Sequence, residues 1–284
     1  MTGPTESWAR RAIEPKMERA HGVGKLVVGR RGDLTVVRDC YQEAAIRIRM
    51  PKPGPGMPFE AVLLNTSGGL TGGDRLSVSI EAAADTRLAV TTQAAEKIYR
   101  ASGGIAKVET RLTLHTGASL DWLPQEAILF DGASLERRLD IDMAEDASLV
   151  AVETIMFGRL ARGEVVDNAH LFDRWRLRRG GRLVYAEGLK LSGHVAKKLS
   201  RAAAGGTARA ISTMVMAAPD AEARLDEARA LLDQEMFANV EAGVSAFDGL
   251  LTMRALSADP FLLRRALTLF LTAMRGPLPR VWAT

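Results

Sequence analysis

Short stretches of alternating apolar and polar residues follow one another along the chain after its first twenty or so residues. Two of them, LTVVRD from Leu34 and EAAIRIRM from Glu43, have the period of two that is typical of half-buried strands. The second ends at prolines and glycines between Pro51 and Gly56, which predict a loop. Because the first residues lack any period, we predict a flexible arm at 1–24 and one β-rich domain at 25–284.

The middle of the chain repeats itself. Three similar segments, DTRLAVTTQAA from Asp85, GASLDWLPQEA from Gly117 and DASLVAVETIM from Asp146, begin 32 and 29 residues apart. Each follows an alternating stretch, and these stretches are LSVSIEA, AKVETRLTLH and LERRLDIDMA. A unit of strand, Gly/Asp turn, strand and loop cannot bury its apolar face alone, so the copies must stack. We therefore predict a mainly-β fold of β-helix-like stacked strands, with an ordinary β-sandwich as the competing interpretation.

Helical patterns occur near the C-terminus, after a hairpin predicted to turn at Gly180 and Gly181. The run AEARLDEARALLDQ follows Asp220, which we expect to be the N-cap of an amphipathic helix. A second helix is predicted from the cap Asp259 and Pro260 to the stop at Gly276. The fold class is thus mainly β with two or so C-terminal helices.

Composition and charge narrow the classes of function. The net charge is +4, but 38 basic residues are set against 34 acidic ones that mostly interleave with them, which favours an acidic protein partner over nucleic acid. The longest apolar stretch near the C-terminus contains Arg264 and Arg265 and falls short of the ~20 residues of a membrane span. The N-terminal segment lacks the apolar run of a secretory signal, and a single cysteine, Cys40, cannot form an internal disulfide. We expect a cytoplasmic protein without a membrane segment.

The sequence does not match the local motifs of nucleotide binding, tight metal binding or nucleophilic catalysis. The glycine-rich segment NTSGGLTGGD from Asn65 lacks the Lys and Ser/Thr that a phosphate-binding loop needs, so a tight packing turn is the better interpretation. The four histidines are scattered without the spacing of a tight metal site. No nucleophile elbow is present, and Cys40 has no local histidine partner.

Acidic residues recur within or just after the repeated strands, at Glu96, Glu126 and Glu153, and Gln93 and Gln125 share one offset. Stacking would place these groups in rows. Such a row could line a water-filled passage that holds a divalent ion weakly, or it could be a buried hydrogen-bond ladder that fixes strand register. A hydrolytic pair of carboxylates is a third interpretation, although the sequence shows no defined separation between them.

Seven strings, in order, resemble the UreD/UreH family of urease accessory proteins over roughly Leu34 to the C-terminus. The strings are NTSGGLTGGDRL, TTQAAEKIYR, LPQEAILFDGA, GRLARGE, GRLVYAE, FDGLLTMRAL and PRVWAT. Two positions depart mildly from the family pattern. Ser67 stands where alanine or serine is often expected, and Thr71 stands where valine is frequent. Neither departure changes the glycines or Asp74.

The resemblance implies a right-handed β-helix-like fold and a non-enzymatic scaffold. It implies binding to UreF, which recruits the GTPase UreG, and docking of this assembly on the urease apoprotein. Nickel would pass through an internal tunnel, as cargo in transit with no tightly bound cofactor. Our candidates for weak ligands along that passage are Asp74, Glu96, Glu126, Glu153 and Glu164. The C-terminal helices are expected to face UreF or, alternatively, to cap the open end of the stack.

Two other functions remain open at this point. A β-solenoid enzyme acting on carbohydrate would need exposed aromatic residues to stack sugars, yet the aromatic content is 5% and Trp122 and Trp175 alternate like core residues. A basic nucleic-acid-binding module would show salt-sensitive binding.

Overall fold

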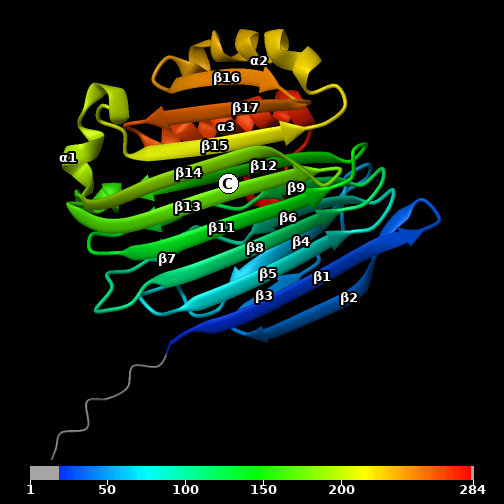
Figure 1. The fold of residues 1–284 in the computed structure, drawn as a ribbon, viewed down its shortest axis with the longest axis horizontal. Coiled ribbons are helices and arrows are strands. Elements are labelled where there is room, and N and C mark those ends of the chain that lie inside the picture. The colour runs from blue at the N-terminus through cyan, green and yellow to red at the C-terminus, as the bar shows by residue number, and fades with distance from the viewer. Residues whose placement is uncertain (1–18, 283–284) are drawn as a thin grey trace, which may run out of the picture.

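Two β-sheets face each other across a buried core in the computed structural model, which describes residues 19–282 (Figure 1). Sheet A has the strand order β14-β13-β11-β8-β5-β1-β2. Its strands are β1 (His21–Arg31), β2 (Leu34–Ala44), β5 (Arg75–Ala82), β8 (Ala106–Leu114), β11 (Ser134–Met143), β13 (Asn168–Arg179) and β14 (Arg182–His194).

Sheet B has the order β16-β17-β15-β12-β9-β6-β4-β3, and the short strands β7 and β10 join it beside β12. Its strands are β3 (Ile46–Arg49), β4 (Phe59–Asn65), β6 (Arg87–Thr92), β7 (Glu96–Ile98), β9 (Ser119–Leu123), β10 (Ala127–Leu129), β12 (Ser148–Phe157), β15 (Ala210–Ala217), β16 (Glu241–Phe247) and β17 (Leu250–Ser257).

The predicted repeat is confirmed as a solenoid-like stack. The three repeated segments form β6, β9 and β12, which pair in parallel with Arg87, Ser119 and Ser148 in one row. The preceding stretches form β5, β8 and β11, which pair in parallel in sheet A. The chain therefore passes from sheet A to sheet B and back in each repeat, and each copy covers the apolar face of the next.

Turns between the two sheets stack in the same way. Gly117 lies between the equivalent residues Asp85 and Asp146, with a φ of 65° and with its amide donating to Asp146 Oδ1 at 3.2 Å. A Cβ at this position would lie 2.4 Å from Asp85 Oδ1. Glycine is therefore required at the middle turn by both its backbone conformation and the lack of space.

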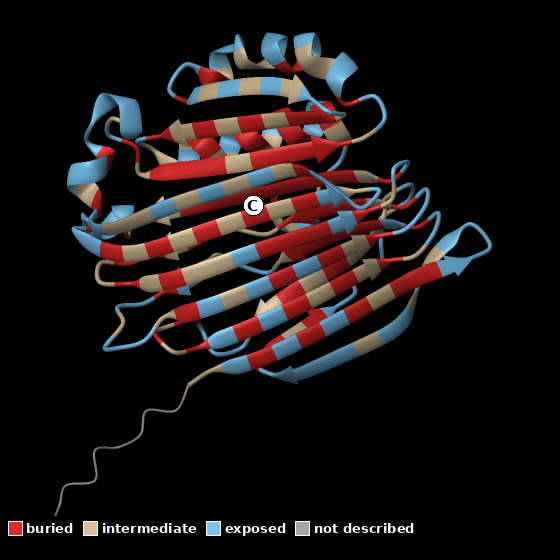
Figure 2. Ribbon diagram, in the orientation of Figure 1, coloured by how far each residue is buried: buried red, intermediate tan, exposed pale blue. Residues whose placement is uncertain are grey.

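Alternation along the strands separates a buried face from a solvated one. Figure 2 shows buried residues alternating with intermediate or exposed ones along β13, β8 and β5 of sheet A. The inward side chains, among them Leu26, Ile80, Leu112 and Trp175, form the main hydrophobic core between the sheets. The period of two read from the sequence is thus the physical basis of this core.

Antiparallel strands close both ends of the stack, and the helices pack beside the strands of one of these ends. β2 and β3 lie at one end, and β14, β15, β17 and β16 at the other. The helices are α1 (Val195–Leu199), α2 (Leu225–Leu232) and α3 (Pro260–Arg275), with short 3-10 turns at Leu160–Arg162, Ala202–Ala204, Glu222–Arg224, Glu235–Phe237 and Arg280–Trp282. A second hydrophobic core joins α3 to sheet B. None of the described helices combines the length and apolar character needed to cross a membrane.

The predictions of two helix N-caps and of an N-terminal arm have different outcomes. The N-cap of α3 is confirmed, because Asp259 Oδ1 accepts the amide of Phe261 at 2.8 Å and Pro260 opens the helix. The N-cap proposed at Asp220 is wrong. The residues around it form a turn with the buried Ala221, a 3-10 turn follows, and α2 begins only at Leu225. Most of the predicted arm, 1–18, lies outside the described residues, and β1 takes in its last part from His21.

Candidate functional site: an acidic cavity between the sheets

A cavity of about 250 Å³ lies between the inner faces of the two sheets. Apolar side chains of sheet A, including Leu76 and Val108, form part of its wall. The polar part of the wall consists of Asn65, Thr92, Gln93, Glu96, Lys97, Thr110, Gln125, Arg137 and Glu153. Gly68, Gln93 and Ala94 also line it and are exposed, so the cavity opens to solvent at the loops that follow β4 and β6. Its volume is sufficient for several water molecules.

The inner part of this cavity is bounded by a buried ionic cluster of three side chains. Arg137 on β11 binds Asp173 on the neighbouring β13 through Nε–Oδ1 at 3.2 Å and Nη2–Oδ2 at 2.7 Å. Arg137 Nη2 also lies 3.1 Å from Oε2 of Glu153 on β12 of the opposite sheet. The three side chains are exposed by 10%, 9% and 4%, respectively. One guanidinium therefore faces two carboxylates where little water screens them.

Burial controls the protonation of Glu153. Desolvation raises the pKa of Glu153 to about 7, against the opposing effect of the Arg137 charge and of the Trp122 indole, which donates to Glu153 Oε1 at 2.9 Å. Burial by itself lowers the pKa of Arg137, but the charges of Asp173 and Glu153 raise it above its ordinary value. Arg137 thus stays charged while Glu153 is poised to gain or lose a proton near neutral pH.

Glu96 is the second carboxylate in the cavity wall, near the opening. It lies on β7, and Asn65 Nδ2 donates to both of its carboxylate oxygens at 3.1 Å. Desolvation raises the pKa of Glu96 to about 7, and the Asn65 hydrogen bond opposes this rise.

The shifted pKa predicts a pH dependence of stability that Glu96→Gln should remove. Between the ordinary pKa of 4.5 and the folded value of about 7, the folded protein binds more protons than the unfolded chain. The free energy of unfolding therefore falls as pH rises through this range. We expect Glu96→Gln to be more stable than the parent by up to about 3 kcal/mol at pH 8 and equal to it near pH 4.

Urea unfolding at both pH values measures this difference. Asp33→Asn is the control, because it removes a carboxylate from a side chain that is 98% exposed. A Glu96→Gln effect of the same size at pH 4 and pH 8 would contradict the prediction.

Two polar atoms in the cavity wall have no hydrogen-bond partner. They are Glu153 Oε2, an acceptor, and Gln125 Nε2, a donor. The approach of Arg137 to Glu153 Oε2 is close but lacks the direction of a hydrogen bond. Buried polar atoms without partners are costly, so these two mark where water or a polar guest gains most by entering.

Strand register explains why Glu126 does not join this row. Glu96 on β7 pairs with Ala127 on β10, and Ala127 pairs with Ile155 on β12. Glu153 lies two residues before Ile155 and faces the same way, whereas Glu126 is one residue out of step and points to the other face of sheet B. Of the five predicted ligands, only Glu96 and Glu153 line the cavity.

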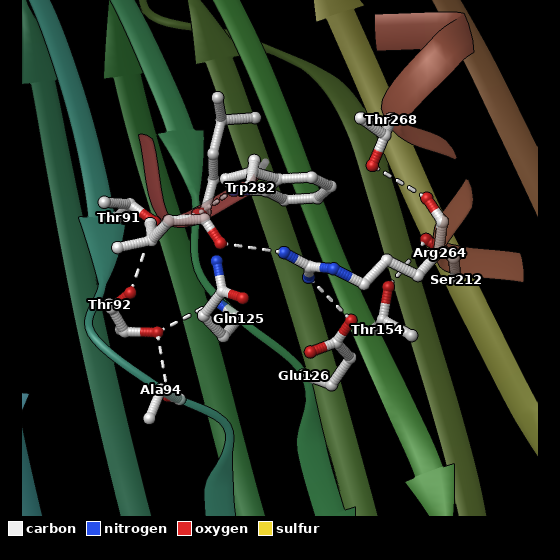
Figure 3. Close-up of polar contacts among 12 residues, drawn as sticks. Thr91, Thr92, Ala94, Gln125, Glu126, Thr154, Ser212, Arg264, Thr268 and Trp282 are labelled. Atoms are coloured by element: carbon white, nitrogen blue, oxygen red, sulfur yellow. Dashed lines mark hydrogen bonds and ion pairs between the residues drawn. The ribbon is translucent and has the colours of Figure 1, made fainter. Parts of the chain in front are cut away.

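Outside the cavity, Glu126 connects α3 to sheet B. Figure 3 shows Arg264 reaching from α3 to Glu126, with an Nη1–Oε1 distance of 2.8 Å. The guanidinium lies 4.8 Å from the ring centre of Trp282, whose indole donates to the Leu123 carbonyl at 3.0 Å. In this structure the carboxylate of Glu126 thus has a cationic partner away from the interior.

Asp74 and Glu164 hold loops at the edges of the stack. Asp74 accepts the amides of Ala20 at 2.8 Å and Thr71 at 2.7 Å and so organises the glycine-rich segment. That segment is a tight packing turn as predicted, because a Cβ at Gly72 would lie 2.3 Å from the Gly103 carbonyl oxygen. Glu164 accepts hydrogen bonds from Arg159, which lower its pKa to about 2.

Described residues 19–282 contain no group of three or more His, Cys, Asp or Glu side chains arranged to hold a metal ion. The cavity thus offers two carboxylates at separate positions and no closed set of ligands. Oxygen ligands in this number bind a divalent cation far more weakly than a closed site of imidazole or thiolate groups.

Sequence reasoning missed Arg137 and Asp173. Both occupy inward positions of an alternating strand, between Leu135 and Leu139 on β11 and between Leu171 and Trp175 on β13. A charged residue in phase with buried neighbours was therefore the signal that could have located the cluster.

Comparison with known proteins places these features in a family. A family model described as UreD urease accessory protein matches residues 20–283. The chain is 45% identical to the urease accessory protein UreD of Xanthobacter autotrophicus, with 100% of both chains covered. It is 47% identical to that of Methylobacterium sp. strain 4-46 over 99% of each chain, and 48% identical to that of Rhizobium leguminosarum bv. trifolii over 95% of this chain and 98% of the relative.

Proposed function

Because the chain belongs to the UreD family of urease accessory proteins, we propose that it is a cytoplasmic, non-enzymatic scaffold through which nickel reaches apo-urease. The observation that carries the proposal is the cavity between the sheets, with Glu96 near its opening and Glu153 deeper in its wall. A conduit must bind its cargo weakly enough to release it. Separate carboxylates and water meet this need, whereas a cluster of His and Cys would retain nickel.

Partner proteins complete this function in our proposal. The scaffold binds UreF, which brings the GTPase UreG, and the assembly docks on the urease apoprotein. We place the UreF-facing surface on the outer side of α3, because Phe261 and Leu269 are 65% and 43% exposed there while the opposite side packs in the second core. Exposed apolar side chains on a helix, here one turn to either side of the exposed Arg265, suit a groove in a partner protein.

The double variant Glu96→Gln/Glu153→Gln tests the passage. We expect roughly a tenfold or greater loss of nickel incorporation into urease, because the amides keep the shape of the cavity and lose its negative charge. Nickel content and urease activity of the purified complex are the measurements. Asp33→Asn/Asp226→Asn is the matched control, since it also removes two carboxylates, from side chains 98% and 97% exposed.

Co-purification with UreF, UreG and the urease subunits tests the scaffold role separately from the nickel passage. If the Glu96/Glu153 variant still assembles but loads little nickel, both parts of the proposal hold. Full nickel loading by this variant would refute the passage, and full activation of urease without the chain would refute the scaffold itself.

Neither alternative function gains support from the geometry. Trp122, Trp175 and Trp282 are 4%, 1% and 5% exposed, so these described tryptophans offer no platform for stacking a sugar. Several outward charges on sheet A face an opposite charge on a neighbouring strand, as in the pairs Glu109–Arg138 and Asp140–Arg176. Such interleaving reduces the positive potential that nucleic-acid binding requires.

A further inference from the structure

Arg137 holds a fixed positive charge in the cavity wall. Its guanidinium is fixed by two parallel hydrogen bonds to Asp173, at 3.2 and 2.7 Å. That fork geometry determines the orientation of the group, so its approach to Glu153 Oε2 at 3.1 Å is the result of its binding to Asp173. Asp173 thus acts as a positioning residue for Arg137.

Glu153 is left with an incomplete set of partners. Trp122 donates to Oε1 at 2.9 Å, whereas Oε2 accepts no hydrogen bond although the side chain is only 4% exposed. With Asp173 matched to Arg137, the charge of Glu153 remains only partly compensated. A second cation entering from the cavity would find this oxygen available, but with a fixed positive charge beside it.

We propose that Arg137 is a built-in competitor for the cation at Glu153, which lets a divalent ion reach this carboxylate but prevents it from staying there. The guanidinium does not deprotonate under any ordinary condition, so the competition is permanent. Asp173 neutralises Arg137 within the fold, which makes a buried charge tolerable at this position. The inference rests on the proposed passage of nickel and adds to it the reason why the ion is released.

The double variant Arg137→Gln/Asp173→Asn tests this role at constant net charge. It removes one positive and one negative charge and leaves Glu153 without a competing cation. We expect the purified full-length chain to bind Ni²⁺ roughly tenfold tighter or more, measured by equilibrium dialysis with Ni²⁺ alone as the probe. In the complex with its partners, urease should then acquire nickel more slowly.

Three further variants make the test specific. Adding Glu153→Gln to the double variant should abolish the gain in affinity, and Arg137→Lys, which retains the charge, should keep the parent affinity. If the Gln/Asn pair does not fold, Arg137→Met/Asp173→Leu replaces it, since exchange of a buried ion pair for apolar residues is often neutral or stabilising.

The outcomes distinguish this inference from the function on which it rests. Unchanged Ni²⁺ affinity in both charge-neutral pairs would overturn the role of Arg137 and leave the passage standing. A gain that persists after Glu153→Gln would also overturn it, because the competition would then not act at Glu153. Failure of the parent chain to support nickel loading of urease would overturn the passage, whatever the affinities.

Discussion

Replacement of Arg137 by glutamine alone is expected to destabilise the fold by about 3–5 kcal/mol. The substitution leaves Asp173 and Glu153, with side chains 9% and 4% exposed, facing each other without a cation. Arg137 is the cation that acts on Glu153. The other basic side chain of the cavity wall, Lys97, acts on Glu96. Loss of the Arg137 charge also raises the pKa of Glu153, so uptake of a proton relieves part of this cost and the loss should grow as pH rises. Urea unfolding followed by circular dichroism at pH 6 and pH 8 measures it.

Addition of Asp173→Asn should restore part of that stability, because it removes one of the two buried carboxylates left without a cation, while Glu153 remains. The recovery follows because the cost comes from an uncompensated buried charge and not from the lost contact itself. Equal stability of the single and double variants would show that the ionic cluster is not balanced as the distances indicate.

Replacement of Trp282 by alanine is expected to cost about 3–5 kcal/mol. The side chain is 5% exposed in the core between α3 and sheet B. Its loss removes the ring beside Arg264 and the hydrogen bond to the Leu123 carbonyl at 3.0 Å. Denaturant unfolding followed by circular dichroism measures the effect without relying on tryptophan emission.

Two further variants separate the contribution of the Trp282 ring from that of its hydrogen bond and from that of the exposed side of the helix. Trp282→Phe should cost only about 1–2 kcal/mol, because the ring remains and the Leu123 carbonyl still accepts the Thr91 hydroxyl at 2.7 Å. Phe261→Ala on the exposed side of the same helix should change stability by less than about 0.5 kcal/mol. A Trp282→Ala effect as small as that of Phe261→Ala would refute the anchoring of α3 through the C-terminal segment.

The elements predicted with success are those whose signals are local. The repeats from Asp85, Gly117 and Asp146 specify turns and alternating strands, and these strands pair in register as expected. Asp259, Pro260 and Gly276 mark both ends of α3, because capping depends on neighbouring backbone groups. The cap at Asp220 failed since contacts distant in sequence, such as the bond from Arg224 to the Met274 carbonyl at 2.6 Å, hold that segment as a turn.

For the candidate site as well, the sequence indicated the residue types correctly, and the strand register decided which of them meet. Sequence spacing suggested a row through Glu96, Glu126 and Glu153, but one residue of register between β7 and β10 turns Glu126 outward to Arg264. The number of positions between the two paired rows differs from repeat to repeat, being nine from Arg87 to Glu96, eight from Ser119 to Ala127 and seven from Ser148 to Ile155. Spacing along the chain therefore does not report which face a side chain takes.

By itself, the sequence determined the family, the stacked β-architecture and the second C-terminal helix, because these depend on alternation, turn residues and caps within short segments. Only the tertiary structure decided that Glu96 and Glu153 share a cavity, that Glu126 anchors α3, and that Arg137 lies between Asp173 and Glu153. The first of these arrangements joins two strands of sheet B through β10, the second joins segments more than a hundred residues apart, and the third joins the two opposite sheets. They arise from packing and from the need of each buried charge for a partner, which no local pattern encodes.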